Sequence, residues 1–125
     1  MVAYNFRKRF VKPIEDGTKK QTIRRVGKRR HVRPGEKIQV YFAQRTQHCR
    51  KILEDDPSCL AVFDLEVVLG DDGFESIKVQ GQEIPPEQFD EFAQKDGFAD
   101  AADMFNYWLE ESTPRNFKGL LIEWE

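Results

Sequence analysis

Alternating apolar and polar residues predict β-strands along much of the chain. The clearest case is 37–43, where Ile38, Val40 and Phe42 fall on one face, as in a half-buried strand. The segment 59–69 is rich in Val, Leu and Phe, and these residue types favour strands. Further strands are expected at 4–10, 20–25, 76–79 and 117–124.

Helical spacing dominates late in the chain. Phe89, Phe92 and Ala93 define one face of a helix that begins near Glu87, and a second helix is expected at 100–111. Asp100 has the character of an N-cap for that second helix. A short helical turn at 10–14 is closed by Gly17, 26–32 is an exposed basic loop, and 44–57 is polar and gives no clear element.

These elements predict an α+β fold. Five or six mostly antiparallel strands with two or three helices pack naturally as a small closed barrel whose end the helices cover. The 125 residues match the usual size of one domain, so we expect a single domain over 1–125.

Charge is distributed unevenly along the sequence. The net charge is −2, yet residues 1–51 contain 16 Lys and Arg against three acidic residues, and the remainder contains four against 19. This asymmetry favours an anionic ligand for the basic half. Neutralisation of one half by the other within the fold is the alternative, and both can hold at once.

The sequence gives no sign of a membrane segment, a secretion signal or a metal site. No apolar stretch approaches the roughly 20 residues of a membrane helix, so we expect a cytoplasmic protein without membrane contact. Cys49 and Cys59 are expected to be free thiols in that compartment. With only His31 and His48 as histidines and no CxxC pair, we expect neither metal nor cofactor.

One short segment concentrates chemistry-bearing side chains. Residues 17–24 fit the pattern GxKxxTxR. On a strand Lys20, Thr22 and Arg24 would share one face, while a twist after the glycine could turn Lys19 inward. A lysine beside a threonine hydroxyl can act as its base when burial or nearby cations lower the amine pKa. The alternative is an ordinary β-forming threonine and a solvated lysine.

This pattern resembles the signature of the ASCH domain, a branch of the PUA-like superfamily of small β-barrels. Three later segments strengthen the resemblance. Residues 33–37 resemble the turn that follows the signature, 96–98 with the aromatic residues of the next helix resemble the family's "(D/E)GF…EF…W" segment, and 121–124 resembles its last strand. The resemblance therefore covers nearly the whole chain.

The resemblance implies an amidohydrolase that removes the acyl group from N(4)-acetylcytidine or related N-acylated (deoxy)cytidine nucleosides. The family's catalytic lysine and threonine match Lys19 and Thr22, and its glutamate falls at Asp96, which is one methylene shorter; Glu91 is the second choice. We expect Thr22 to attack the amide carbonyl with help from Lys19. Arg24 or backbone N–H groups would stabilise the oxyanion, and Asp96 would activate water.

The same resemblance leaves two alternatives, an RNA-binding PUA-like module and a ribonuclease. The scarcity of histidines makes a two-histidine ribonuclease the weakest hypothesis. We expect Arg24, Lys20 and Tyr41 to bind the nucleoside, with Tyr41 stacking on a base. RNA is the alternative partner, and the protein itself is expected to be a monomer or weak dimer. The residues expected to contact RNA phosphates are Arg25, Lys28, Arg29, Arg30 and Arg33.

Overall fold

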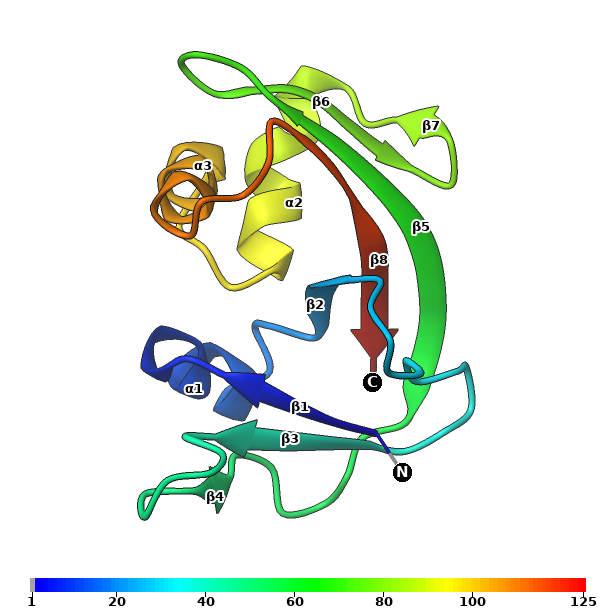
Figure 1. Ribbon diagram of the computed structural model, residues 1–125, viewed down its shortest axis with the longest axis vertical. Helices are drawn as coiled ribbons and strands as arrows, with labels where there is room; N and C mark the ends of the chain where they lie inside the picture. The colour runs from blue at the N-terminus through cyan, green and yellow to red at the C-terminus, as the bar shows by residue number, and fades with distance from the viewer. Residues whose placement is uncertain (1) are drawn as a thin grey trace.

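Two β-sheets and three α-helices build the protein (Figure 1). The structure is a computed structural model that describes residues 2–125. The smaller sheet contains β1 (Val2–Phe6), β3 (Ile38–Phe42) and β4 (Arg50–Lys51), in the order β1-β3-β4. β1 runs parallel to β3, and β3 pairs antiparallel with β4.

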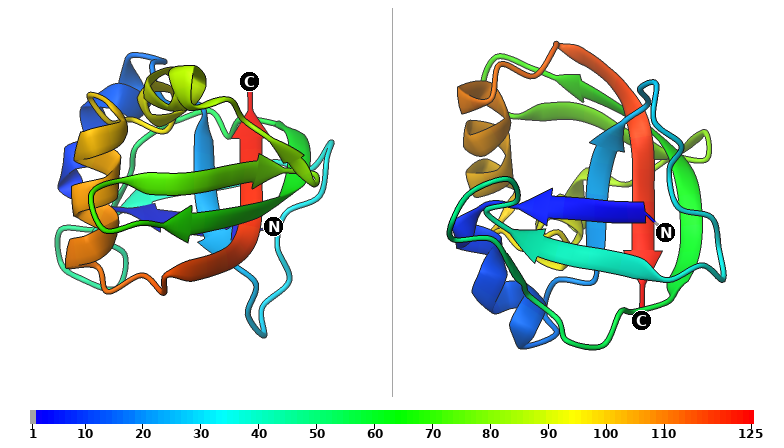
Figure 2. Two further views of the ribbon diagram at one scale, coloured as in Figure 1. Left: turned by 90° about the horizontal axis from the view of Figure 1, so that it is seen from above. Right: turned by 60° about the horizontal axis from the view of Figure 1, so that its bottom comes forward.

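The larger sheet is entirely antiparallel and has the order β2-β8-β5-β6-β7. Its strands are β2 (Gln21–Arg25), β8 (Asn116–Trp124), β5 (Cys59–Leu69), β6 (Phe74–Val79) and β7 (Gln82–Glu83). Figure 2 shows that the strands of the smaller sheet run across those of the larger one. An isolated bridge between Lys37 and Ser58 links the chain just before β3 to the chain just before β5.

The α+β class and the predominance of antiparallel pairing are confirmed. Six strands have five residues or more, as predicted, and the two-residue strands β4 and β7 are additional. The strand pairing of residues 2–125 forms two sheets, and the closed barrel stays a prediction. The proposed opening strand over 4–10 is wrong in its second half, because the strand ends at Phe6.

A helix replaces that second half. α1 (Lys8–Glu15) begins before the predicted turn because Phe10, Val11 and Ile14 lie on one helical face, and all three are buried. The helix ends before Gly17, whose φ of +85° gives the left-handed conformation expected there. The chain then turns back and enters β2.

Two further helices pack on the concave side of the larger sheet (Figure 1). α2 (Phe89–Lys95) follows a 3₁₀ turn, and α3 (Ala101–Glu110) follows the predicted cap, in which the Asp100 carboxylate accepts a hydrogen bond from the Asp103 N–H at 2.8 Å. None of the helices in the described part of the chain has the length and apolar character needed to cross a membrane.

Aromatic side chains fill the space between these helices and the sheet. Phe74 on β6 meets Phe105 and Trp108 of α3 edge-on, with ring centroids 5.5 and 5.6 Å apart. Trp108 in turn packs against Phe117 at 5.2 Å. These contacts fix α3 at a set distance from the sheet, and a pocket lies between the helix and β2.

Candidate functional site

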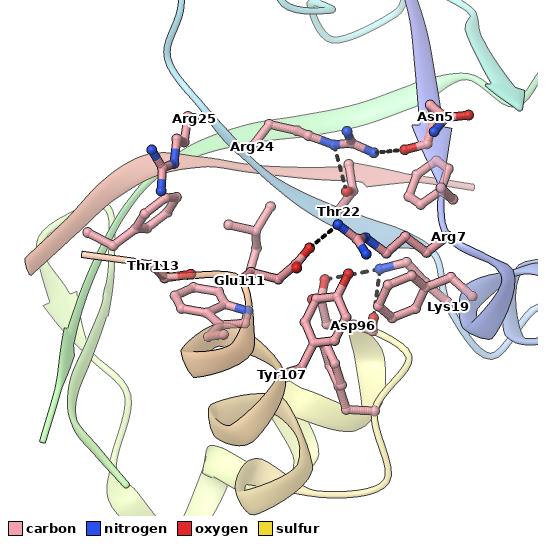
Figure 3. A pocket seen from close by; sticks show the side chains of 16 residues that line it. Asn5, Arg7, Lys19, Thr22, Arg24, Arg25, Asp96, Tyr107, Glu111 and Thr113 are labelled. Carbon is pink, nitrogen blue, oxygen red and sulfur yellow. Dashed lines mark hydrogen bonds and ion pairs between the residues drawn. The ribbon is translucent and has the colours of Figure 1, made fainter. Parts of the chain in front are cut away.

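A pocket of about 570 Å³ contains most of the residues that the sequence singled out (Figure 3). It is built from the end of β1, the start of α1, strand β2, the loop after α2 and the C-terminal half of α3. Its volume lies within the range typical of sites for small molecules. Among its lining side chains are Lys19, Thr22, Arg24, Arg25 and Asp96.

Lys19 enters the pocket because the chain turns sharply after α1. The Asp16 carboxylate accepts hydrogen bonds from the Thr18 N–H at 3.0 Å and hydroxyl at 2.6 Å, and the Lys19 N–H binds the Pro13 carbonyl at 2.9 Å. The Lys19 ammonium then lies 4.7 Å from the centre of the Phe10 ring. Only 2% of the residue is exposed, so Lys19 is a buried cation and not a solvated one.

Asp96 is the partner of this cation. The Lys19 Nζ donates to the Asp96 backbone carbonyl at 2.6 Å and to the carboxylate Oδ1 at 3.3 Å. Gln21 Nε2 donates to the same Oδ1 at 3.3 Å. Within residues 2–125, no side chain donates to Oδ2, the second carboxylate oxygen. One oxygen therefore anchors the pair, and the other has no donor among the described residues.

Gly97 makes this close approach possible. Its φ is +95°, a conformation that residues with a Cβ adopt rarely. A Cβ added to Gly97 would lie 2.9 Å from Cδ of Lys19 and 3.1 Å from Cδ1 of Phe10. The lysine stem thus packs directly against the glycine backbone, which explains the glycine after Asp96.

Burial shifts the protonation of both partners. Removal from water lowers the pKa of the Lys19 ammonium, and the Asp96 charge partly opposes that change. Removal from water likewise raises the pKa of the Asp96 carboxyl against the opposing effect of Lys19. Both shifts favour the neutral forms, so burial narrows the gap between the two pKa values and lowers the cost of moving a proton from Lys19 to Asp96.

Thr22 and Arg24 form a second linked pair in the pocket. The Thr22 hydroxyl oxygen accepts a hydrogen bond from Arg24 Nε at 3.1 Å, which leaves the hydroxyl proton available to another acceptor. Arg24 also donates from Nη2 to the Asn5 carbonyl at 2.9 Å. Its guanidinium carbon lies 4.9 and 4.8 Å from the ring centres of Tyr4 and Phe6. These contacts hold the guanidinium in one orientation.

Two predicted substrate-binding residues lie outside the pocket. Lys20 is exposed, because β2 begins at Gln21 and the strand alternation does not extend back to residue 20. Tyr41 lies half-buried on β3 in the smaller sheet, and its side chain does not line the pocket. The predicted trio of Lys19, Thr22 and Asp96 therefore shares one cavity, while Lys20 and Tyr41 do not enter it.

The predicted RNA-contacting residues lie mostly on the exposed segment after β2. Arg25 lines the pocket, whereas Lys28, Arg29 and Arg33 are exposed on the loop. Arg30 binds both oxygens of the Glu36 carboxylate, at 2.7 and 3.1 Å. This pairing removes one cation from the set that could meet a phosphate.

The two histidines do not form a catalytic pair in this fold. His31 Nδ1 lies 2.8 Å from the Tyr4 hydroxyl and Nε2 lies 2.8 Å from the Arg25 carbonyl, so both ring nitrogens are engaged. His48 is exposed on another loop. Across residues 2–125, no group of three or more His, Cys, Asp or Glu side chains is arranged to hold a metal ion.

Sequence reasoning missed several residues that line the pocket or bond to its lining. Gln21 sits inside the GxKxxTxR pattern, yet nothing in its identity indicated a bond to Asp96. Tyr107 has a raised pKa because of burial, and Figure 3 shows it beside Lys19 and Asp96. Arg7 and Glu111 form an ion pair at 2.5 Å, and such a pairing gives no sequence signal.

Comparison with known proteins adds no assignment: no family model, no curated protein and no solved structure matches this chain. The case for a function rests on the pocket itself and on the residue pattern that led to it.

Proposed function

We propose that the protein is an amidohydrolase that removes the acyl group from N(4)-acetylcytidine or a related N-acylated cytidine, and that it is a PUA-like barrel of the ASCH type. One observation carries the proposal. The Lys19 ammonium is buried against the Asp96 carboxylate, 77 residues away, in the same cavity as the Thr22 hydroxyl. Buried titratable groups with shifted pKa values in a cleft are candidates for a functional site.

The contacts support a definite order of proton transfers. Lys19 first passes a proton to Asp96 along the 3.3 Å contact, which leaves a neutral amine and a carboxylic acid. The Thr22 oxygen then attacks the acyl carbon while its proton moves to the amine. When the C–N bond breaks, Lys19 returns that proton to the departing cytidine nitrogen, and an acyl ester remains on Thr22.

Hydrolysis of that ester restores the site. Asp96 first returns its proton to Lys19 and becomes a carboxylate again. This carboxylate takes a proton from water, and the resulting hydroxide attacks the ester carbon. The acid leaves, and Asp96 gives the proton it took from water to the Thr22 oxygen, which restores the hydroxyl and the carboxylate. Arg24 holds its guanidinium beside Thr22, from where it would donate to the carbonyl oxygen of the acyl group, on which the negative charge develops. Loss of one such donor typically costs about 3 kcal/mol of transition-state stabilisation.

Absorbance spectroscopy tests the proposal directly, because removal of the acyl group changes the cytosine chromophore. Thr22→Ala and Lys19→Ala should each lower kcat by about 100-fold or more, while Thr22→Ser should retain much of the activity. Thr46→Ala and Lys118→Ala are matched controls at exposed positions outside the pocket, and both should behave as wild type. A Lys19→Ala variant that turns over at the wild-type rate contradicts the assignment.

An RNA-binding module is the second candidate, and the exposed cations at Lys28, Arg29 and Arg33 favour it. Each phosphate contact that these residues make would add to the salt dependence of binding. An RNA titration at two salt concentrations therefore separates the candidates. Turnover without RNA affinity supports the enzyme, and salt-sensitive binding without turnover supports the module. A two-histidine ribonuclease gains no support, since both nitrogens of His31 are engaged.

A further inference from the structure

The charges that line the pocket do not balance. Its cations outnumber its carboxylates by four to two; they are Arg7, Lys19, Arg24 and Arg25, against Asp96 and Glu111. Each carboxylate already pairs with one cation, Asp96 with Lys19 at 3.3 Å and Glu111 with Arg7 at 2.5 Å. In a protein whose net charge is −2, the pocket therefore has an excess of two positive charges.

The two uncompensated cations are Arg24 and Arg25, for which no carboxylate partner exists among residues 2–125. Arg24 is held by Thr22, by the Asn5 carbonyl and by two aromatic rings, so its position belongs to the reaction end of the pocket. The Arg25 guanidinium has no hydrogen-bond or carboxylate partner among residues 2–125. It lies 6.0 Å from the centre of the Phe117 ring, and its planar N–H groups remain available to a ligand.

Arg25 marks the end of the pocket opposite the reacting groups. Figure 3 shows Arg25 and Thr113 at one side of the cavity and Lys19 with Asp96 at the other. Phe117 joins the Arg25 end through its contact with that guanidinium. This end thus combines a cation, a hydroxyl and an aromatic surface, and the acidic lining residue Glu111 is paired with Arg7.

We propose that Arg25 binds the phosphate of a nucleoside 5′-monophosphate, so that the substrate is an N-acylated cytidine 5′-monophosphate in preference to the free nucleoside. This inference rests on the proposed function and specifies its substrate class. A phosphate monoester carries about −1.5 to −2 charges at neutral pH, which suits a pocket whose lining has an excess of two positive charges, one of them, Arg25, at this end. Arginine binds phosphate through two parallel N–H···O bonds. The acyl group then lies at the Lys19 end and the phosphate at the Arg25 end.

The test measures binding without turnover. Wild type, Arg25→Gln and the control Lys118→Gln are titrated with cytidine 5′-monophosphate and with cytidine. Wild type and the control should bind the monophosphate about tenfold more tightly than cytidine, in a salt-sensitive manner, and Arg25→Gln should lose that preference. Unchanged cytidine affinity in Arg25→Gln shows that the pocket is intact.

Equal affinity of wild type for the two ligands, or an unaltered preference in Arg25→Gln, overturns the phosphate site. Tight binding of a short RNA without terminal phosphate, combined with no preference for the monophosphate, also overturns it and assigns the cations to an RNA strand. These outcomes are distinct from failure of the amidohydrolase. A protein that prefers the monophosphate but does not cleave acylated cytidine keeps the anion site and loses only the proposed reaction.

Discussion

Replacement of Lys19 by methionine separates a catalytic ion pair from a structural one. Lys19→Met removes the ammonium but keeps an unbranched apolar chain against Phe10 and Gly97. The side chains of Lys19 and Asp96 are 3% and 7% exposed, so water replaces the missing cation poorly. The variant is therefore left with an unpaired carboxylate in the interior.

The magnitude follows from that burial. Removing one partner of a buried pair costs about 3–5 kcal/mol of unfolding free energy, because the other charge stays desolvated. With an unfolding entropy of about 2.1 cal/mol/K per residue and 125 residues, Tm should fall by roughly 10–20 °C. Asp96→Asn should cost less, because the shorter Lys19 bond, 2.6 Å, goes to the backbone carbonyl of residue 96, which asparagine retains.

The double variant Lys19→Met/Asp96→Asn has no buried charge at these positions. Its asparagine can still accept the hydrogen bond from Gln21. Because neutral replacement of a buried ion pair is often without net cost, the double variant should recover at least about 2 kcal/mol relative to Lys19→Met. Its activity on acylated cytidine should nevertheless remain abolished, as in Lys19→Met, because both proteins lack the amine that acts as the base.

Urea unfolding of the four proteins gives the coupling energy of the cycle, and the absorbance assay gives their turnover. Additive losses, with a coupling near zero, would show that the two charges do not interact as their contact indicates. Turnover in the double variant would show that the pair only supports the fold, and the proton transfers proposed above would be wrong. Stability without activity in that variant is the result that the structure predicts.

Three further predictions test the surroundings of this pair. In Lys19→Met, burial keeps the pKa of Asp96 raised. The loss of unfolding free energy relative to wild type should therefore be small below pH of about 4 and grow as the pH rises through the pKa of Asp96 in the folded protein. A loss that does not change with pH would contradict this. In Asp96→Asn, loss of the carboxylate that raises the pKa of Lys19 should move the acidic limb of the kcat/KM profile to lower pH, and an unmoved limb would mean that Lys19 is not the base. Gly97→Ala should cost more unfolding free energy than Gly35→Ala, because both glycines have positive φ but only at Gly97 would a Cβ meet other atoms, the nearest at 2.9 Å; equal Tm losses would contradict the close packing of Lys19.

Long strands and capped helices were predictable because their signal is local and repeated. The predicted limits of β5, 59–69, agree with the structure, since eleven consecutive residues carry a strongly apolar pattern. The cap at Asp100 was equally readable, because its hydrogen bond is made only three residues away. Such elements need no knowledge of their neighbours.

Short elements were not predictable for the opposite reason. The apolar residues at Tyr4 and Phe6 continue at Phe10, so a single strand over 4–10 fits the pattern as well as a strand followed by a helix. The two-residue strands β4 and β7 exist only because they pair with β3 and β6. Their own residues carry no strand signal that could be read in isolation.

The residues of the candidate site likewise divide into those with a local sequence signal and those that depend on the complete fold. Lys19 and Thr22 come from one eight-residue pattern, and the structure places both in one pocket. Lys20 belongs to the same pattern but is exposed, because β2 begins only at Gln21. The sequence did not show at which residue this strand begins, so the exposure of Lys20 was not predicted. Arg7 and Glu111 meet only through the packing of α1 against α3, so their contact depends on the complete fold.

The length of the carboxylate at position 96 is the point at which the sequence departs from the ASCH pattern that it resembles. Aspartate is one methylene shorter than glutamate, and its reach to the lysine was in question. In the structure, the backbone carbonyl of Asp96 makes the shorter contact with the lysine. Gly97 lets the Lys19 stem approach the main chain closely, and the ammonium binds the carbonyl of residue 96 at 2.6 Å before it meets the carboxylate. The backbone contact thus places the ammonium within reach of the shorter carboxylate. A Cβ at residue 97 would block this approach, so the ion pair depends on the glycine as well as on the acid.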